Sequence, residues 1–360
     1  MRTRVLGVWL SLSLRETTRQ RFAGRLHFPP MPLDHYISQV HLRQFYSPKL
    51  GDRLYAVRKS DLKTFKPTAT AVCAIQDGSS NSFLREDRAI EDFLKKIEPH
   101  YNQAVEALRA EAITQETVFT LAGFVAFVAT CSPAAMRIFS GFLRRNVETV
   151  SEMIDARGGF PPPPPQLGGR SMTELLRTGA IRIDVDEKYP QAMGISSILS
   201  HAARFGNYSW DILRNDADDS PFFTSDFPVA IEATAHAQWV NRIVPLAPDL
   251  AIRIQPDERT PQDKLDLSFP NFRYRSRTPQ RFEIVELNRL IVRSAEELVI
   301  FRDDHPWVRS FIENNREYRV EPHTQEMRTP KGKLLFFAQR IMKAQSEAAD
   351  CRHRPDDGGP

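Results

Sequence analysis

Two short stretches of the sequence hold the residues best able to do chemistry. The first, DHYISQVHLRQF, contains His35 at the N-terminal edge of a short helix expected over residues 36–45. The dipole of a helix disfavours positive charge at this end and so favours a neutral imidazole. A neutral imidazole can act as a base or bind a metal. The structural alternative is a histidine that is hydrogen-bonded to the backbone beneath the helix.

The second stretch, FFTSDFPV, places Thr224, Ser225 and Asp226 at the end of an expected strand, which Pro228 terminates. Polar residues where a chain turns are frequent in functional sites. Asp226 could bind a metal or orient a histidine, and Ser225 could bind a substrate. These residue types are also standard turn formers, so an Asx or Ser/Thr turn is the structural alternative.

A third stretch, NFRYRSRTPQRF, alternates arginines with aromatic residues. In a strand, Arg273, Arg275 and Arg277 would share one face, while Phe272 and Tyr274 would lie on the other. Guanidinium groups in a row suit phosphates, and aromatic rings can stack on bases. A charged edge strand exposed to solvent explains the same pattern without a ligand.

The elements that must position these residues predict an α+β fold. Short strands are expected over 53–75, a helical middle over about 86–213, and further small β pieces after residue 215. Within the helical middle, Pro99 should kink the first helix, and the apolar run 118–131 should form a central buried helix. Later elements are a helix near 280–294, the strand ELVIF and a helix near 306–315.

The domain organisation expected is a single domain over 31–320, with a proline-rich surface loop, RGGFPPPPPQLGGR, at 157–170. Docking of a proline-binding partner on this loop is the sharper alternative. Residues 321–360 are expected to form a helix followed by a disordered tail. Residues 1–30 are expected to lie outside the core, as a loose extension or as sequence upstream of a start at Met31.

Composition narrows the function classes. The formal net charge is +4, but residues 1–30 contain six arginines and one glutamate, so the rest of the chain carries −1. The body of the protein is therefore not basic, which weakens any general case for nucleic-acid binding. The three cysteines are far apart, which suits a reducing compartment and predicts a cytoplasmic protein. The most apolar run is too short to span a membrane, so no membrane contact is expected.

Several common catalytic motifs are missing from the sequence. It contains no Walker loop, no GxGxxG, no HExxH, no EF-hand loop and no GxSxG elbow. ATPases, dinucleotide oxidoreductases, zincins and serine hydrolases of the α/β type are therefore disfavoured.

The stretches together resemble one family, the mainly bacterial domain of unknown function 4238. Its members open with His-Tyr-x-Pro-x-x-Tyr-Leu-Arg-x-Phe and later carry Thr-Ser-Asp-Asn-Pro and Pro-Leu-x-Pro blocks. The matching positions here are His35, Tyr36, Leu42, Arg43, Phe45, Thr224, Ser225, Asp226, Pro228, Pro245, Leu246 and Pro248, with a similar segment around Asn288 and Ala295. The resemblance covers about 33–305 and implies no activity.

Three positions depart from the family pattern: Ser38 replaces proline, His41 an aromatic residue and Phe227 asparagine. If the family asparagine belongs to a site, Phe227 puts that site in doubt here.

These residues support two functions. In the first, His35, Asp226, Ser225 and Asn288 line one pocket and catalyse metal-assisted hydrolysis of a phosphoester or nucleic acid. Asp226 and His35 would bind a divalent metal, and an anionic substrate would lie against Arg273, Arg275 and Arg277. In the second, the protein is a non-enzymatic binding or interaction module in which His35 and Asp226 are structural. The sequence leaves both open.

Overall fold

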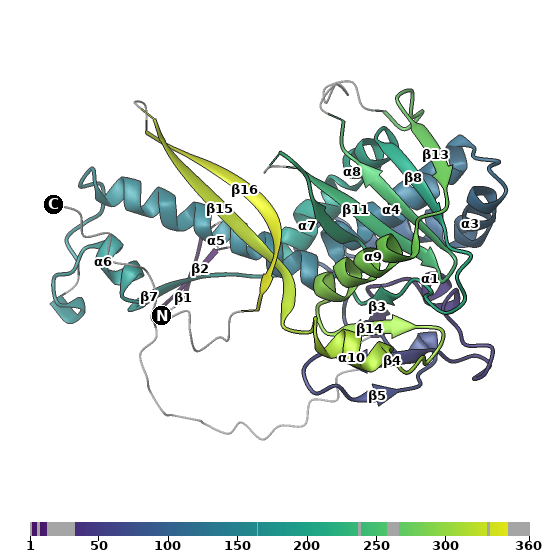
Figure 1. Cartoon of the computed structure of the whole chain (residues 1–360). Coiled ribbons are helices and arrows are strands. Elements are labelled where there is room, and N and C mark those ends of the chain that lie inside the picture. The colour runs from purple at the N-terminus through teal and green to yellow at the C-terminus, as the bar shows by residue number, and fades with distance from the viewer. Residues whose placement is uncertain are drawn as a thin grey trace, which may run out of the picture.

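The computed structural model describes residues 2–5, 8–12, 33–163, 165–236, 239–257, 266–329 and 332–344. The fold is α+β, as predicted. A larger lobe holds most of the strands and helices, and a smaller lobe surrounds the far half of one long helix, α5 (Pro133–Asp155) (Figure 1).

A five-stranded sheet forms the centre of the larger lobe, in the order β10-β11-β12-β8-β13. Its neighbouring strands are antiparallel except β13, which runs parallel to β8. The strands are β10 (Ala230–Ala233), β11 (Val240–Ala247), β12 (Leu250–Gln255), β8 (Ser209–Arg214) and β13 (Arg273–Arg277).

Both faces of this sheet are covered. In β12, Ile252 and Ile254 belong to the core that contains helix α4 (Gln115–Cys131), whereas Ala251 belongs to the core formed with α9 (Arg281–Ser294). This two-sided burial follows from the alternation of side chains along a strand.

A four-stranded antiparallel sheet combines two strands from the N-terminal part of the chain with two from its C-terminal part. The strand order is β5-β4-β14-β9. Its strands are β5 (Thr64–Phe65), β4 (Tyr55–Arg58), β14 (Leu298–Phe301) and β9 (Thr224–Ser225). The helix α10 (Val308–Glu313) packs beside it. A further short pair joins β3 (Leu33–His35) to β6 (Ala74–Gln76), and α1 (Gln39–Arg43) follows β3.

The helical middle agrees with the prediction in its main features. Helix α2 (Ala89–Ile97) is separated from α3 (Tyr101–Arg109) by a 3-10 turn that contains Pro99. Helix α4 is buried along nearly its whole length, and Thr114 caps its first turn. Within the described ranges, no single helix is both long and apolar enough to cross a membrane. Helices α4 and α5 reach that length and composition only as a pair, bent by 55°.

The helical middle expected over about 86–213 is wrong at its C-terminal end. The chain forms α7 (Lys188–Ser196) and α8 (Ile198–Gly206) and then enters strand β8. In β8, Trp210 and Ile212 pack in the α4 core while Leu213 packs in the α9 core. The adjacent residues Ile212 and Leu213 are both apolar because both faces are buried, so the sequence SWDILR lacks the regular apolar–polar alternation that distinguishes a strand from a helix.

The helix expected after residue 320 is also wrong. The chain forms a long hairpin of β15 (Tyr318–Thr329) and β16 (Gly332–Lys343), which crosses α5 between the two lobes (Figure 1). Every strand residue finds its backbone partner in the other arm, and Val320 and Ile341 pack against the main core. The predicted tail over 345–360 lies outside the described residues.

The smaller lobe contains α6 (Met172–Arg177) and β7 (Ile181–Val185), a strand that the sequence analysis missed. Strand β7 pairs with β2 (Val8–Leu12), which pairs with β1 (Arg2–Val5). Residues 13–32, which include Met31, lie outside the described residues, so the assignment of residues 1–30 stays a prediction. The described residues of the proline-rich segment are mostly exposed and lie between α5 and α6.

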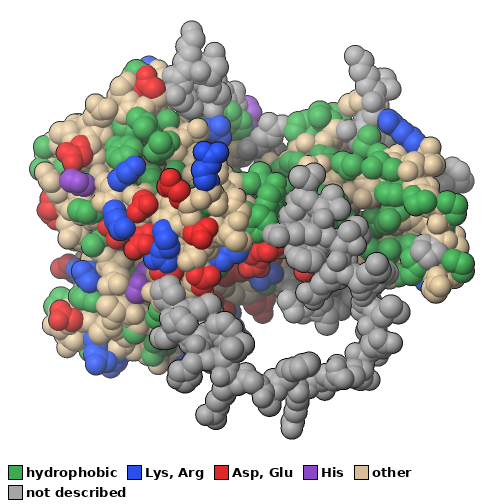
Figure 2. Space-filling view, turned by 180° about the vertical axis from the view of Figure 1, so that it is seen from behind, with side chains coloured by type: hydrophobic (Ala, Val, Ile, Leu, Met, Phe, Trp, Pro, Cys, Tyr) green, Lys and Arg blue, Asp and Glu red, His purple; other side chains and the backbone are tan. Residues whose placement is uncertain are grey.

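The surface differs between the lobes. In Figure 2, acidic and basic side chains are interspersed over the larger lobe, whereas apolar side chains cover much of the smaller lobe. Exposed apolar residues of α5 include Val150, Met153 and Ile154.

Candidate functional site

Asp226 follows β9, and its carboxylate is buried and fully hydrogen-bonded. Oδ1 accepts from the backbone N–H of Glu296 (2.9 Å), and Oδ2 accepts from those of Glu297 (2.7 Å) and Leu298 (2.9 Å). Burial raises the pKa of Asp226 to about 6, against the lowering effect of the Leu298 and Glu297 N–H groups and of Lys59. The carboxylate thereby holds the turn between α9 and β14.

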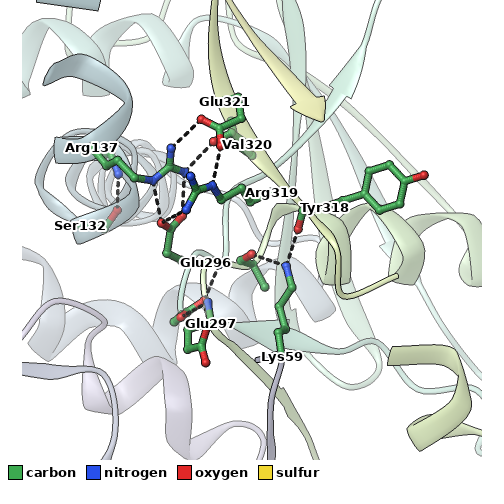
Figure 3. A network of polar contacts seen from close by, with 12 residues as sticks. Lys59, Ser132, Arg137, Glu296, Glu297, Tyr318, Arg319, Val320 and Glu321 are labelled. Atoms are coloured by element: carbon green, nitrogen blue, oxygen red, sulfur yellow. Dashed lines mark hydrogen bonds and ion pairs between the residues drawn. The ribbon is translucent and has the colours of Figure 1, made fainter. Parts of the chain in front are cut away.

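Lys59, at the end of β4, is buried next to this turn. Its Nζ donates to the carbonyl oxygens of Ala295 and Tyr318, both at 2.6 Å (Figure 3). Burial lowers the pKa of Lys59 to about 8, although Asp226 and the neighbouring glutamates raise it. This one side chain therefore links β4, the end of α9 and the start of β15.

An ion-pair cluster lies beside Lys59. Arg137 on α5 binds both carboxylate oxygens of Glu296, at 2.6 and 2.8 Å, and reaches Glu321 on β15 at 2.9 Å. Arg319 also binds Glu321, at 2.5 Å, so the two arginines converge on the same acids (Figure 3). The cluster joins α5, the α9–β14 turn and the hairpin.

His41 connects the first motif to the second. Its ring is fully buried, its Nε2 lies 2.9 Å from Thr224 Oγ1, and its Nδ1 lies 2.7 Å from the Tyr101 hydroxyl. The ring also stacks on Phe124 of α4, with 4.9 Å between centroids. Burial lowers the pKa of His41 to about 3, so the ring is neutral near neutral pH.

His35, the histidine singled out from the sequence, lies in β3 and pairs with Ala74. Its Nδ1 is 3.3 Å from Nε2 of Gln39, and its Nε2 is buried without a hydrogen-bond partner. In the described part of the chain, no hydrogen bond or ion pair joins His35 to Asp226.

Ser225 and Asn288 are both completely buried. Ser225 Oγ accepts from the backbone N–H of Phe227 at 3.1 Å, as in a turn. Asn288 on α9 accepts from Phe223 N–H and donates to the Pro221 carbonyl, both at 2.9 Å. Ser225, Asp226 and Asn288 therefore lie around one segment, 221–227, and their hydrogen bonds go to the backbone.

The arginine strand is the edge strand β13, and its charges are largely paired. Arg275 binds both carboxylate oxygens of Asp211, at 2.6 and 2.9 Å. Arg277 binds both carboxylate oxygens of Glu283, at 2.5 and 2.8 Å. Arg273 is exposed at the start of the strand. The three arginines are thus adjacent, but only Arg273 faces solvent without an acidic partner in the described residues.

A cavity of about 510 Å³ lies between α5, α7, α8, β11 and β16. Its wall is mainly apolar and includes Phe139, Phe142, Leu143, Val240 and Phe337. This volume is within the range of pockets that bind small molecules, which are typically about 300–1,000 Å³.

Two basic side chains occupy one part of this wall. Arg242 donates from Nη2 to Gln339 Oε1 at 2.7 Å, and its Nη1 is buried without a partner. Burial lowers the pKa of Arg242 to about 10. Burial, with Arg204 and Arg242 nearby, lowers the pKa of His201 to about 4, so its imidazole is neutral at neutral pH.

No local sequence pattern predicts this cavity, because its lining comes from six elements in distant parts of the chain, among them α4 through Thr130. One local signal was present: Arg242 is the single charge in the strand sequence VNRIVPLA, in which every other residue except Asn241 is apolar. An arginine in such a strand needs a partner or a cavity.

Metal ligation was part of one functional hypothesis. Within the residues that the structure describes, no three His, Cys, Asp or Glu side chains gather closely enough to hold a metal ion. The two cysteines in this part, Cys73 and Cys131, are buried and free.

The comparisons with known proteins identify a family. The family described as "Protein of unknown function (DUF4238)" matches residues 34–305, which is most of the chain. No curated protein and no solved structure matches. The match covers both sequence motifs and the elements that carry Asp226, His41 and the cavity residue Arg242, and the chain therefore belongs to the DUF4238 family.

Proposed function

We propose that this protein is a non-enzymatic binding module whose ligand occupies the cavity between α5, α7, α8, β11 and β16. The observation that carries the proposal is the cavity itself, about 510 Å³ in volume and lined mostly by apolar side chains. Preformed concave sites with an apolar wall and a few polar groups are the usual form of small-molecule sites.

In this proposal His35 and Asp226 are structural. Three backbone N–H groups already occupy the carboxylate of Asp226, so a metal ligated there would compete with them. The hydrogen bonds of Ser225 and Asn288 to the backbone support the same role. Metal-assisted hydrolysis stays the alternative prediction for these residues.

The arginine strand is a secondary candidate for contacts with partners. Asp211 and Glu283 neutralise Arg275 and Arg277, which leaves little net charge for phosphates. Charged side chains on an edge strand also discourage pairing with other chains.

Binding is tested with an environment-sensitive apolar dye, titrated against the full chain. We expect saturable fluorescence enhancement in the parent protein and a large loss in Leu143→Trp, because the larger ring fills the cavity. Leu199→Trp is the matched control, since Leu199 lies on α8, is 49% exposed and does not line the cavity. Equal dye binding in all three proteins would contradict the proposal.

The alternative is tested with Asp226→Ala and His35→Ala. We expect Asp226→Ala to lower the free energy of unfolding by about 3 kcal/mol, because three buried N–H groups lose their acceptor. The control Asp61→Ala, at an exposed position, should change it by no more than about 0.5 kcal/mol. Hydrolysis of RNA, DNA or phosphodiesters with Mg²⁺ or Mn²⁺ that disappears in both variants, while both remain folded, would instead establish the hydrolase.

A further inference from the structure

The polar part of the cavity wall contains a charge without a counter-charge. Arg242 Nη1 is buried, yet it has no hydrogen-bond partner, and Nη2 donates only to the neutral amide of Gln339. In the described residues, no aspartate or glutamate lies within ion-pair distance of this guanidinium group. Burying a charge is costly unless it is paired, so an unpaired arginine beside a cavity indicates an anionic partner from outside the chain.

A neighbouring arginine shows how this fold treats the same residue elsewhere. Arg253 on β12 lies next to β11 and is paired with three acids, Asp211, Glu232 and Glu283. Its side chain is 14% exposed. Among the described residues, three carboxylates pair with Arg253 and none with Arg242, although the two strands are adjacent.

The rest of the cavity is suited to an apolar body. Phe142 packs edge-on against both Phe139 and Phe337, with centroid separations of 6.1 and 5.3 Å. These rings join α5 to β16 and line the same cavity as Arg242. A ligand that fills the cavity must therefore present an apolar surface to the rings and an anionic group to the guanidinium.

We propose that the cavity binds a monocarboxylate with an apolar chain, such as a medium-chain fatty acid, whose carboxylate pairs with Arg242. This rests on the proposed function and names its ligand class. One buried guanidinium matches one negative charge, and its free Nη1 can donate a charge-assisted hydrogen bond to a carboxylate oxygen. His201, which lines the same cavity, is neutral and can donate one further N–H. A phosphate dianion would leave one charge unbalanced.

The experiment measures, by calorimetry on the full chain, the binding of decanoate, decanol, decylamine and decyl phosphate. We expect decanoate to bind about tenfold or more tightly than decanol, because a hydrogen bond to a charged group is added to the same apolar contacts. Arg242→Met should remove this preference while decanol still binds. Arg204→Met is the matched control, because Arg204 is an exposed arginine of α8 that does not line the cavity, and it should retain the preference.

The outcomes separate this inference from the proposed function. Equal binding of decanoate and decanol to the parent, or tighter binding of decyl phosphate or decylamine, would overturn the ligand class but leave cavity binding intact. Absence of binding by all four compounds and by the dye would overturn both. If Arg242→Met does not fold, the four head groups are compared on the parent protein and on Arg242→Lys. Both proteins keep a positive charge in the cavity wall, so this comparison still tests the ligand class.

Discussion

At the scale of single residues, the histidine that matters most to this fold is His41. It lies 183 positions before its partner Thr224, and it also contacts Tyr101 and Phe124. His41 stands where the family pattern has an aromatic residue, and its imidazole is a planar ring that adds two nitrogen atoms. Both ring nitrogens have hydrogen-bond partners, so the polar replacement is tolerated inside the core.

His41 should make the stability of the protein sensitive to acid. The pKa of His41 is lowered to about 3 in the folded protein, so below about pH 6.5 only the unfolded chain gains a proton readily. Stability due to this group is therefore complete at neutral pH and is lost as the pH falls. Between about pH 7 and about pH 5, we expect the parent to lose about 2 kcal/mol more unfolding free energy than His41→Gln does.

Denaturant titrations at the two pH values measure this difference. Acidic side chains and the other histidines are common to both proteins, so their effects cancel. The same acid sensitivity in His41→Gln and in the parent would show that His41 is not the cause.

At the scale of elements, the hairpin β15–β16 depends on a close approach to α5. A Cβ added at Gly141 would lie 2.6 Å from Cγ of Pro322, which is too close for real atoms. Glycine in a helix is otherwise unfavourable by about 0.5–1 kcal/mol relative to alanine. Its presence in the middle of α5 is explained by the proline ring of the crossing strand.

We therefore expect Gly141→Ala to destabilise the protein by about 1–3 kcal/mol, because the rigid ring cannot move away without shifting the hairpin. The double variant Gly141→Ala/Pro322→Ala removes the obstructing ring atoms and should recover most of the loss. Thermal or chemical unfolding of the two single variants and the double variant completes the cycle. Additive effects in that cycle would contradict the proposed contact.

At the scale of the whole molecule, Lys59 and the Arg137 cluster connect segments far apart in sequence. Lys59 ties β4 to residue 295 and to the first residue of β15, 259 positions away. Arg137 ties α5 to Glu296 and Glu321. The hairpin, which forms one wall of the cavity, is thus held at its base by charged groups from three other elements.

Replacement of Lys59 by methionine should loosen the hairpin more than the rest of the fold. The carbonyl oxygens of Ala295 and Tyr318 would lose their buried donor, at a cost of about 2 kcal/mol. Hydrogen–deuterium exchange should then accelerate in 318–343 while α4, in the centre of the main core, stays protected. Uniform acceleration across both elements would show that Lys59 stabilises the fold as a whole.

The sequence by itself determined the features that depend on neighbouring residues. The buried character of α4, the break at Pro99 and the alternation of Arg273, Arg275 and Arg277 in β13 follow from local patterns and local chemistry. The turn-forming character of Ser225 and Asp226 was visible in the same way. Periodicity, proline geometry and turn propensity act within a few residues, so the local sequence predicts these features directly.

Only the tertiary structure decided which polar residues meet. Strand β8 is buried on both faces, and the hairpin packs on α5, so local pattern misassigned both. Likewise, His41 rather than His35 contacts the second motif, and Arg242, His201 and the aromatic rings come together from four elements. Burial and hydrogen bonding between segments hundreds of residues apart are set by packing of the whole chain, which no local pattern encodes.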